Sequence, residues 1–177
     1  MDTSSKFAQF SNTLSEWNRV HNLTGAKTPQ EIYRNIEDSI YPTKFIAKPD
    51  SILDIGSGAG FPAIPLAIIY SDIRVVLCEP RNKRASFLKF VSIELGLNNV
   101  EVVKRRVENY FDPEPFHLIT SRAVTDTKML LKLTAHLRGE ATKYLFYKGE
   151  NIFNELQNIK SMEYKIVTKD RRNYLYI

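Results

Sequence analysis

The sequence has few residues of the kinds that crosslink a chain or bind metal ions. It contains one cysteine, Cys78, and three histidines among its 177 residues. A single thiol excludes an internal disulfide and a cysteine-based zinc cluster. Because Cys78 ends the apolar run at residues 75–78, we expect a buried structural thiol and no metal centre.

Long hydrophobic runs are also missing. The longest, residues 63–70, is interrupted by Pro65 and is far shorter than the roughly 20 residues that a membrane-spanning helix needs. Residues 1–10 contain no apolar signal segment. The composition, 43% hydrophobic and 25% charged, is typical of a globular protein. We therefore expect a cytoplasmic, monomeric protein with a single domain over residues 1–177.

The spacing of hydrophobic residues divides this domain into two parts. Through residue 48, apolar side chains recur every three or four residues, which predicts a helical extension, and Thr28, Pro29 and Glu31 mark a helix start. In the core, residues 49–177, Val-, Ile- and Leu-rich strands alternate with helices, the pattern of a doubly wound, mostly parallel α/β sheet. Strands are expected at 51–55, 74–79, 100–104, 116–121 and 143–148, helices at 62–70, 82–95, 126–137 and 151–159, and a hairpin at 164–167 and 174–177.

Three glycines follow the first strand of the core. Asp54 lies near the end of that strand, and Gly56, Gly58 and Gly60 alternate in the turn behind it. Glycine lets the backbone turn sharply and approach a ligand, at which the next helix directs its free N–H groups. An acid two residues before G-x-G-x-G favours S-adenosylmethionine, as in Rossmann-like class I methyltransferases, over a nicotinamide cofactor, whose fingerprint is G-x-G-x-x-G. A purely structural turn, with Asp54 as a cap, is the alternative.

Charged residues stand at the ends of the other strands, where a doubly wound sheet binds its ligands. Glu79 follows Asp54 by roughly 25 residues, a spacing that suits an acceptor for two ribose hydroxyls. Glu108 comes after the third strand, close to where an adenine would lie, and Arg122 could pair with a carboxylate or phosphate. Each of these residues could instead be a solvated surface residue.

Basic residues outnumber acidic ones, which gives a net charge of +5 and favours a polyanionic partner such as nucleic acid. Taken one at a time, these cations are more readily explained as solvated surface residues. Taken together around one cleft, they are candidate RNA contacts. The candidates are Lys83, Arg84, Lys104, Arg105, Arg106, Lys128 and Lys148.

Two kinds of methyl acceptor are disfavoured by the sequence. It has no Asn-Pro-Pro-Tyr or Asp-Pro-Pro-Tyr loop for exocyclic amines, since residues 112–116 resemble that loop only superficially and precede the fourth strand. Cys78, inside a strand, is no credible nucleophile for pyrimidine C5 methylation. The methyl acceptors that remain are those that need little or no activation before they attack the methyl group.

Several motifs, in order and spacing, resemble those of one family, the bacterial small-subunit ribosomal RNA guanine-N7 methyltransferases called RsmG or GidB. The similar segments are WN at 17–18, HNLT at 21–24, LDIGSGAGFP at 53–62, KR at 83–84, ELGL at 94–97, VE at 107–108, TSRA at 120–123 and KG at 148–149. The chain departs from the family pattern in residues 35–39, at Ala63 and at His117.

The resemblance implies cofactor contacts at Gly56, Phe61, Val107, Glu108 and Arg122. Residues and resemblance together predict one binding site for S-adenosylmethionine. Its members are Asp54, Gly56, Ser57, Gly58, Gly60, Phe61, Glu79, Val107, Glu108 and Arg122.

The resemblance also implies a reaction, methyl transfer to N7 of one guanine in 16S ribosomal RNA, either free or within the small subunit. N7 carries a lone pair and needs no general base, so positioning of the reactants and exclusion of water would dominate. No catalytic residue is certain; Arg122 and Lys148 are candidates, and Phe61, Tyr110 or Tyr147 would either stack on the guanine or pack inside. A small-molecule methyltransferase and a non-catalytic RNA-binding module remain as alternatives.

Overall fold

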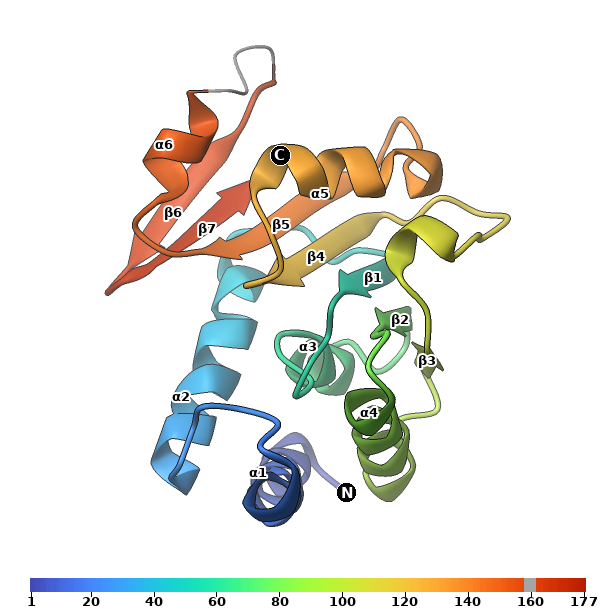
Figure 1. Ribbon diagram of the computed structural model, residues 1–177, viewed down its shortest axis with the longest axis vertical. Helices are drawn as coiled ribbons and strands as arrows, with labels where there is room; N and C mark the ends of the chain where they lie inside the picture. Colours follow the sequence, from blue (N-terminus) through green and yellow to red (C-terminus); the bar gives the residue numbers. More distant parts are fainter. Residues whose placement is uncertain (158–161) are drawn as a thin grey trace.

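The computed structural model describes residues 1–157 and 162–177 and contains a seven-stranded sheet in the order β3-β2-β1-β4-β5-β7-β6 (Figure 1). The first five strands are parallel, whereas β7 runs antiparallel to both β5 and β6. The expected mostly parallel sheet and C-terminal hairpin are confirmed, with strand ends shifted by up to two residues. The strands are β1 (Ser51–Ile55), β2 (Arg74–Cys78), β3 (Val100–Val103), β4 (Leu118–Arg122), β5 (Lys143–Lys148), β6 (Lys165–Lys169) and β7 (Arg172–Tyr176).

The helices also lie close to their expected positions. The helix predicted at 126–137 ends earlier, because Thr134 leaves helical geometry at φ −110° and ψ 6°. The helix predicted at 151–159 covers Ile152–Leu156, and its last two predicted residues fall outside the described part of the chain. The helices are α1 (Thr3–His21), α2 (Pro29–Ile40), η1 (Tyr41–Lys44), α3 (Ala63–Ile69), α4 (Asn82–Glu94), η2 (Val107–Asn109), α5 (Thr127–Leu133), η3 (Ala135–Leu137) and α6 (Ile152–Leu156).

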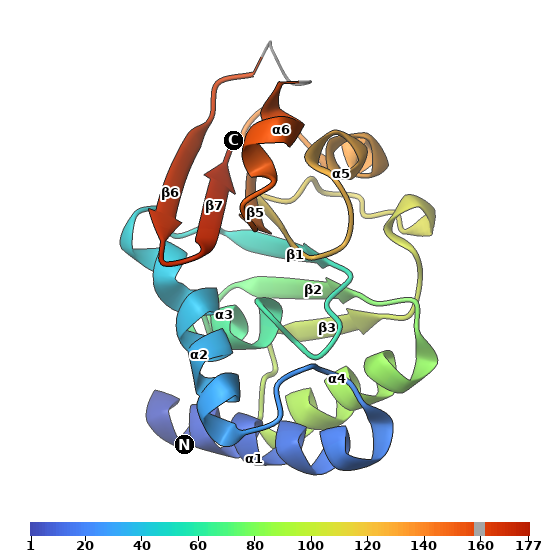
Figure 2. The same cartoon turned by 60° about the vertical axis from the view of Figure 1, so that its left-hand side comes forward.

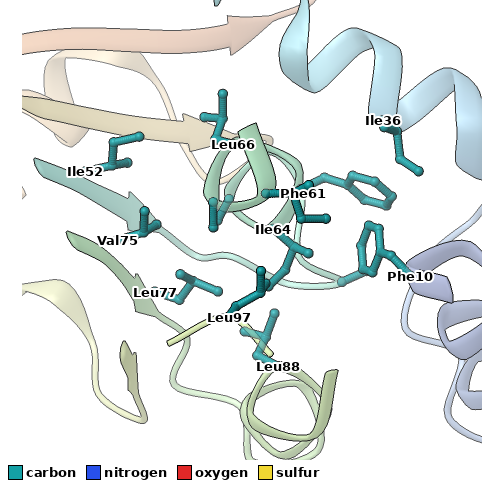
Figure 3. Close-up of a cluster of buried hydrophobic side chains, with 14 of the residues drawn as sticks. Phe10, Ile36, Ile52, Phe61, Ile64, Leu66, Val75, Leu77, Leu88 and Leu97 are labelled. Atoms are coloured by element: carbon teal, nitrogen blue, oxygen red, sulfur yellow. The ribbon is translucent and has the colours of Figure 1, made fainter. Parts of the chain in front are cut away.

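Helices cover both faces of the sheet, which explains why its central strands are apolar on both sides. Figures 1 and 2 show α1 to α4 on one side and α5 and α6 on the other. Alternate residues of β1 enter different cores: Ile52 faces α1 to α4, and Leu53 faces α5 and α6. Cys78 is buried in the second core, as expected for a structural thiol. In Figure 3, side chains of β1 and β2 pack against α3, α4 and the N-terminal helices.

The helical extension packs directly on the core. The predicted start of α2 is confirmed as a capping box, in which Thr28 and Glu31 each accept a hydrogen bond from the other's backbone N–H. From α1, the Phe10 ring lies edge-on to Phe61, at 5.3 Å between centroids, behind the glycine turn. Through this contact, the helical extension supports the part of the sheet where the ligand site is expected.

No helix within residues 1–157 and 162–177 is long and apolar enough to cross a membrane.

Candidate functional site

The glycine turn leaves the carboxyl end of β1 in a conformation that favours glycine. Gly56, Gly58 and Gly60 have φ values of +66°, +58° and +93°, in the left-handed region where a Cβ is strained. The turn is held by the neighbouring strand, because the Gly56 N–H donates to the Cys78 carbonyl at 2.8 Å. The backbone therefore bends sharply at the edge of the sheet where α/β proteins bind ligands.

A cleft of about 380 Å³ opens over this turn, and we call it the glycine cleft. It contains seven of the residues that the sequence singled out, as cofactor or RNA contacts, from the ends of β1, β2 and β4 and the start of α4. They are Gly56, Ser57, Gly58, Phe61, Glu79, Arg84 and Arg122. Seven further residues complete the wall, namely Leu23, Thr24, Ala59, Pro80, Arg81, Ala123 and Val124.

Gly60 contributes to the packing behind the cleft instead of to its wall. A Cβ at this position would come within 2.8 Å of Ile64 and 3.3 Å of Phe10. At Gly56 the close neighbour is Val124, whose Cγ2 would lie 2.6 Å from an added Cβ. The turn is thus packed from both sides, by α1 and α3 and by the loop after β4.

Glu79 holds the turn through its buried carboxylate. One oxygen accepts the Gly58 N–H at 2.9 Å, and the other accepts the Arg81 N–H at 2.8 Å. Each carboxylate oxygen has a second acceptor position, so the residue can also receive hydroxyl donors from a ligand in the cleft. This position agrees with the role predicted from the spacing of Glu79 and Asp54.

Asp54 lies in β1 and is not part of the cleft wall. Its side chain is fully buried, and one oxygen accepts the Thr120 hydroxyl at 2.7 Å. The other oxygen, Oδ2, has no hydrogen-bond partner in the described part of the chain. Burial raises the pKa of Asp54 to about 7, although the hydrogen bond from Thr120 and the nearby charge of Arg122 oppose this shift. A direct cofactor contact by Asp54 stays a prediction.

Val107 and Glu108 lie in η2, after β3, and neither lines the glycine cleft. Val107 is buried in the core beneath α5, whereas Glu108 is exposed and lies 3.7 Å from Arg106. The structure therefore places them beyond the same edge of the sheet without bringing them to the wall of the cleft. Their contact with a cofactor stays a prediction from the family resemblance.

Arg122 is held by Asp38, a residue that the sequence patterns did not indicate. Its guanidinium pairs with Asp38 of α2 at 3.1 Å and lies over the Phe61 ring, 4.9 Å from its centroid. Asp38 also accepts hydrogen bonds from Arg172 at 3.1 Å and from the Tyr174 hydroxyl at 2.9 Å. Asp38 thereby links α2 and β7 to the cleft, and no local sequence pattern signals this role.

The candidate RNA contacts divide by exposure. Arg84 is half-buried in the cleft wall, and Lys148 is 8% exposed at the end of β5. Lys148 donates to the Thr125 carbonyl at 2.9 Å and to the Glu155 carboxylate at 2.8 Å. The remaining candidates are exposed, as free phosphate contacts would require; they are Lys83, Lys104, Arg105, Arg106 and Lys128.

The three aromatic candidates pack inside the protein. Phe61, Tyr110 and Tyr147 are all buried, at most 8% exposed. The Tyr147 hydroxyl donates to the Ser39 carbonyl at 2.6 Å, and the Tyr110 hydroxyl donates to Asp112. These contacts support the packing alternative over stacking on a base.

The cleft has features that suit a nucleoside cofactor. Its volume falls within the roughly 300–1,000 Å³ typical of ligand pockets. The wall combines an acceptor at Glu79, a guanidinium at Arg122 and backbone without Cβ atoms at Gly56 and Gly58. Among the described residues, no cluster of His, Cys, Asp and Glu side chains could hold a metal ion. The chemistry of the wall therefore fits an organic ligand with hydroxyl and carboxylate groups.

Comparison with solved structures defines the fold. The fold is similar to a methyltransferase from Geobacter sulfurreducens, with a TM-score of 0.67 at 12% identity over 95% of this chain and 87% of that one. It is also similar to coclaurine N-methyltransferase bound to N-methylheliamine and S-adenosylhomocysteine, with a TM-score of 0.60 at 17% identity over 82% of this chain and 50% of that one. The protein has the Rossmann-like fold of S-adenosylmethionine-dependent methyltransferases.

Sequence comparison defines the family. Residues 3–172 match the family model GidB, rRNA small subunit methyltransferase G. A relative from Aliarcobacter butzleri (strain RM4018), named ribosomal RNA small subunit methyltransferase G, is 49% identical over 168 residues, which are 95% of this chain and 86% of the relative. The chain belongs to the rRNA small subunit methyltransferase G family, and the resemblance noted in the sequence is confirmed.

Proposed function

We propose that this protein transfers the methyl group of S-adenosylmethionine to N7 of one guanine in the RNA of the small ribosomal subunit. The observation that carries the proposal is a cleft over a G-x-G-x-G turn, with Glu79 and Arg122 in its wall, in a chain of this family. The name of the Aliarcobacter relative supports the RNA substrate. The choice of N7 rests on the family resemblance and on the chemistry of the site.

The residues of the cleft divide the binding of the cofactor among them. S-adenosylmethionine would supply an electrophilic methyl group on a sulfonium. The glycine turn allows close approach of the backbone, and the Glu79 carboxylate accepts hydrogen bonds from the ribose hydroxyls. Arg122, held by Asp38, presents a guanidinium that pairs with the carboxylate of the amino-acid portion.

The remaining work of the protein is to position the acceptor. Because N7 attacks with its own lone pair, no side chain has to remove a proton, and alignment of the two reactants supplies several kcal/mol. N7 lies in the deep major groove of A-form RNA, so the target guanine must be in a loop or displaced from a stack. The exposed cations Lys83, Lys104, Arg105, Arg106 and Lys128 would hold the phosphates on either side of it.

Methyl transfer from labelled S-adenosylmethionine tests the proposal. The acceptors are small ribosomal subunits, and separately their stripped RNA, prepared from cells that lack the protein. Label recovered as 7-methylguanosine at one position supports the reaction and shows which form is recognised. No label on either acceptor contradicts it.

Thermal stabilisation by S-adenosylhomocysteine separates the alternatives in that case. Stabilisation without transfer to RNA would favour a small-molecule methyltransferase. RNA binding without stabilisation would favour a non-catalytic RNA-binding module. That the protein acts as a monomer in the cytoplasm stays a prediction.

A further inference from the structure

A second pocket lies beside the glycine cleft, at the carboxyl ends of β4 and β5, and we call it the β5 pocket. Its volume is about 280 Å³, slightly below the range of roughly 300–1,000 Å³ typical of drug-sized ligands. Ala123 and Val124 belong to the walls of both pockets. The second pocket therefore suits a group of about the size of one base, placed next to the ligand in the glycine cleft.

Two charged side chains, Lys148 and Glu155, meet in the wall of the β5 pocket. Lys148 Nζ donates to Glu155 Oε2 at 2.8 Å and to the Thr125 carbonyl at 2.9 Å, so one of the three ammonium hydrogens has no partner in the described part of the chain. The Thr127 N–H and hydroxyl also donate to Glu155 Oε2, at 2.9 Å and 2.7 Å. Within residues 1–157 and 162–177, no donor pairs with Glu155 Oε1.

The pair thus presents one donor and one acceptor side by side. Although burial acts to raise the pKa of Glu155, hydrogen bonds from Lys148 and Thr127 lower it overall, so its carboxylate is ionised at neutral pH. An ionised carboxylate only accepts hydrogen bonds, and an ammonium only donates them. The charges of the two groups therefore fix Lys148 as the donor and Glu155 as the acceptor.

We propose that the β5 pocket takes the acceptor guanine and that Lys148 and Glu155 select it, with Lys148 donating to O6 and Glu155 accepting from N1–H. This inference rests on the proposed function. Guanine offers an acceptor at O6 beside a donor at N1, whereas adenine offers a donor at N6 beside an acceptor at N1. Adenine would therefore set donor against donor at Lys148 and acceptor against acceptor at Glu155. Lys148 then acts on the base, in place of the phosphate contact suggested by its charge.

The arrangement of the two pockets agrees with the reaction. In guanine, N7 lies on the edge of the ring that adjoins O6, and N1 lies on the other side of O6. A base held at O6 and N1 by Lys148 and Glu155 can direct N7 at the wall formed by Ala123 and Val124, which both pockets share. Because transfer needs direct contact between N7 and the methyl carbon, the donor in the glycine cleft would meet the base beside these two residues, where the two pockets adjoin.

The variant Glu155→Gln tests the assignment with little change in shape. Because Lys148 and Thr127 both donate on the Oε2 side, the amide oxygen takes that place and the amide NH₂ replaces Oε1. The contacts with Lys148 and Thr127 survive, while the acceptor for N1–H becomes a donor. Glu150→Gln, at an exposed position just before α6, makes the same change of charge outside the pocket and serves as the control.

The measurement is the affinity of the S-adenosylhomocysteine-loaded protein for small subunits reconstituted with guanine or adenine at the methylated position, once the transfer assay has mapped it. We expect the wild type and Glu150→Gln to prefer guanine by about tenfold or more, and Glu155→Gln to prefer it by less than about threefold.

The preference for guanine separates this inference from a structural role of Glu155. A purely structural role would weaken binding to both subunits equally and leave the preference intact. A wild type that methylates the guanine but binds both subunits equally, or a Glu155→Gln variant that keeps the preference, overturns the inference and leaves the proposed function standing. Absence of methyl transfer by the wild type contradicts the proposed function itself.

Discussion

The glycine cleft and the β5 pocket lie side by side but are built in different ways. The cleft is centred on one local turn, from which residues 56–59 and Phe61 enter its wall, and the Glu79 carboxylate holds that turn. The β5 pocket is formed by side chains, with the Lys148–Glu155 pair in its wall and Arg172 reaching it from β7. Under the proposed function, the cofactor site is organised around a local turn, whereas the site for the base depends on side chains from several elements.

The largest effect is expected where the turn meets the core. Gly60→Ala combines a strained φ of +93° with a Cβ 2.8 Å from Ile64, so we expect the free energy of unfolding to fall by about 3–5 kcal/mol. Gly96→Ala, at φ +60° with no atom within 4 Å of the new Cβ, isolates the strain alone and should cost about 1–2 kcal/mol. Urea denaturation measures both. Equal losses would show that close packing behind the turn contributes nothing.

A second prediction concerns Asp54, beneath the same turn. Its pKa is raised by burial from 3.8 to about 7, so the folded state binds a proton more tightly than the unfolded chain. The resulting stabilisation is complete below about pH 4 and is lost as the pH rises through 7. Asp54→Asn should remove this dependence and, at pH 8, be more stable than the wild type by about 2–4 kcal/mol.

Urea denaturation at pH 5 and at pH 8 tests this prediction. The exposed Glu16, changed to Gln, provides the comparison, because a substitution at an exposed position should alter stability little at either pH. If wild type and Asp54→Asn lose stability in parallel between the two pH values, Asp54 is not the group responsible.

The third prediction concerns Asp38 of α2, which holds Arg122 in the glycine cleft and also pairs with Arg172 of β7. Asp38→Ala leaves Arg122 and Arg172 without their common partner. Because the Asp38 side chain is only 16% exposed, we expect a loss of about 2–3 kcal/mol in the free energy of unfolding. Glu37→Ala, an exposed neighbour on α2, should change stability by no more than about 0.5 kcal/mol.

A second readout checks the link from Asp38 to the cleft. The affinity for S-adenosylhomocysteine should fall in Asp38→Ala, since Arg122 is no longer held, and should stay unchanged in Glu37→Ala. Full affinity in a folded Asp38→Ala protein would mean that Arg122 is positioned without Asp38.

The smallest effects are expected on the surface. Lys83→Ala should weaken RNA binding by less than about 1 kcal/mol and reduce the slope of log affinity against log salt by about 0.7–0.9. Lys143→Ala, at the opposite edge of the sheet, should leave the slope unchanged. Filter binding between low and moderate salt gives the slopes. A single slope for the wild type and both variants would exclude Lys83 from the phosphate contacts.

Features formed by residues close together in the sequence were predicted well, and features formed by distant residues were not. The capping box of Thr28 and Glu31 and the glycine turn are local, and both lie where the sequence indicated. The strands of the parallel core could be placed because each is an apolar run bounded by turn residues.

Contacts between distant segments were not predictable in this way. Asp38 pairs with Arg122 across 84 positions, and no local pattern indicates the pair. Lys148 was predicted as a catalytic or RNA-binding candidate, because its charge is visible in the sequence and its burial beside Glu155 is not. Val107 and Glu108 were selected by resemblance, and the structure places them after β3 but outside the cleft wall. Sequence patterns can indicate where the backbone turns. They do not indicate as readily which distant side chains come into contact.

The wall formed by Ala123 and Val124 makes the two binding equilibria of this protein interdependent. Val124 packs against Gly56 on one side and borders the β5 pocket on the other, so a ligand that displaces it in one pocket reshapes the next. The factor by which a bound cofactor would change the affinity for the RNA must equal the factor by which bound RNA would change the affinity for the cofactor. The affinity for the RNA would then be a property of the protein at a stated cofactor concentration and would have no single value.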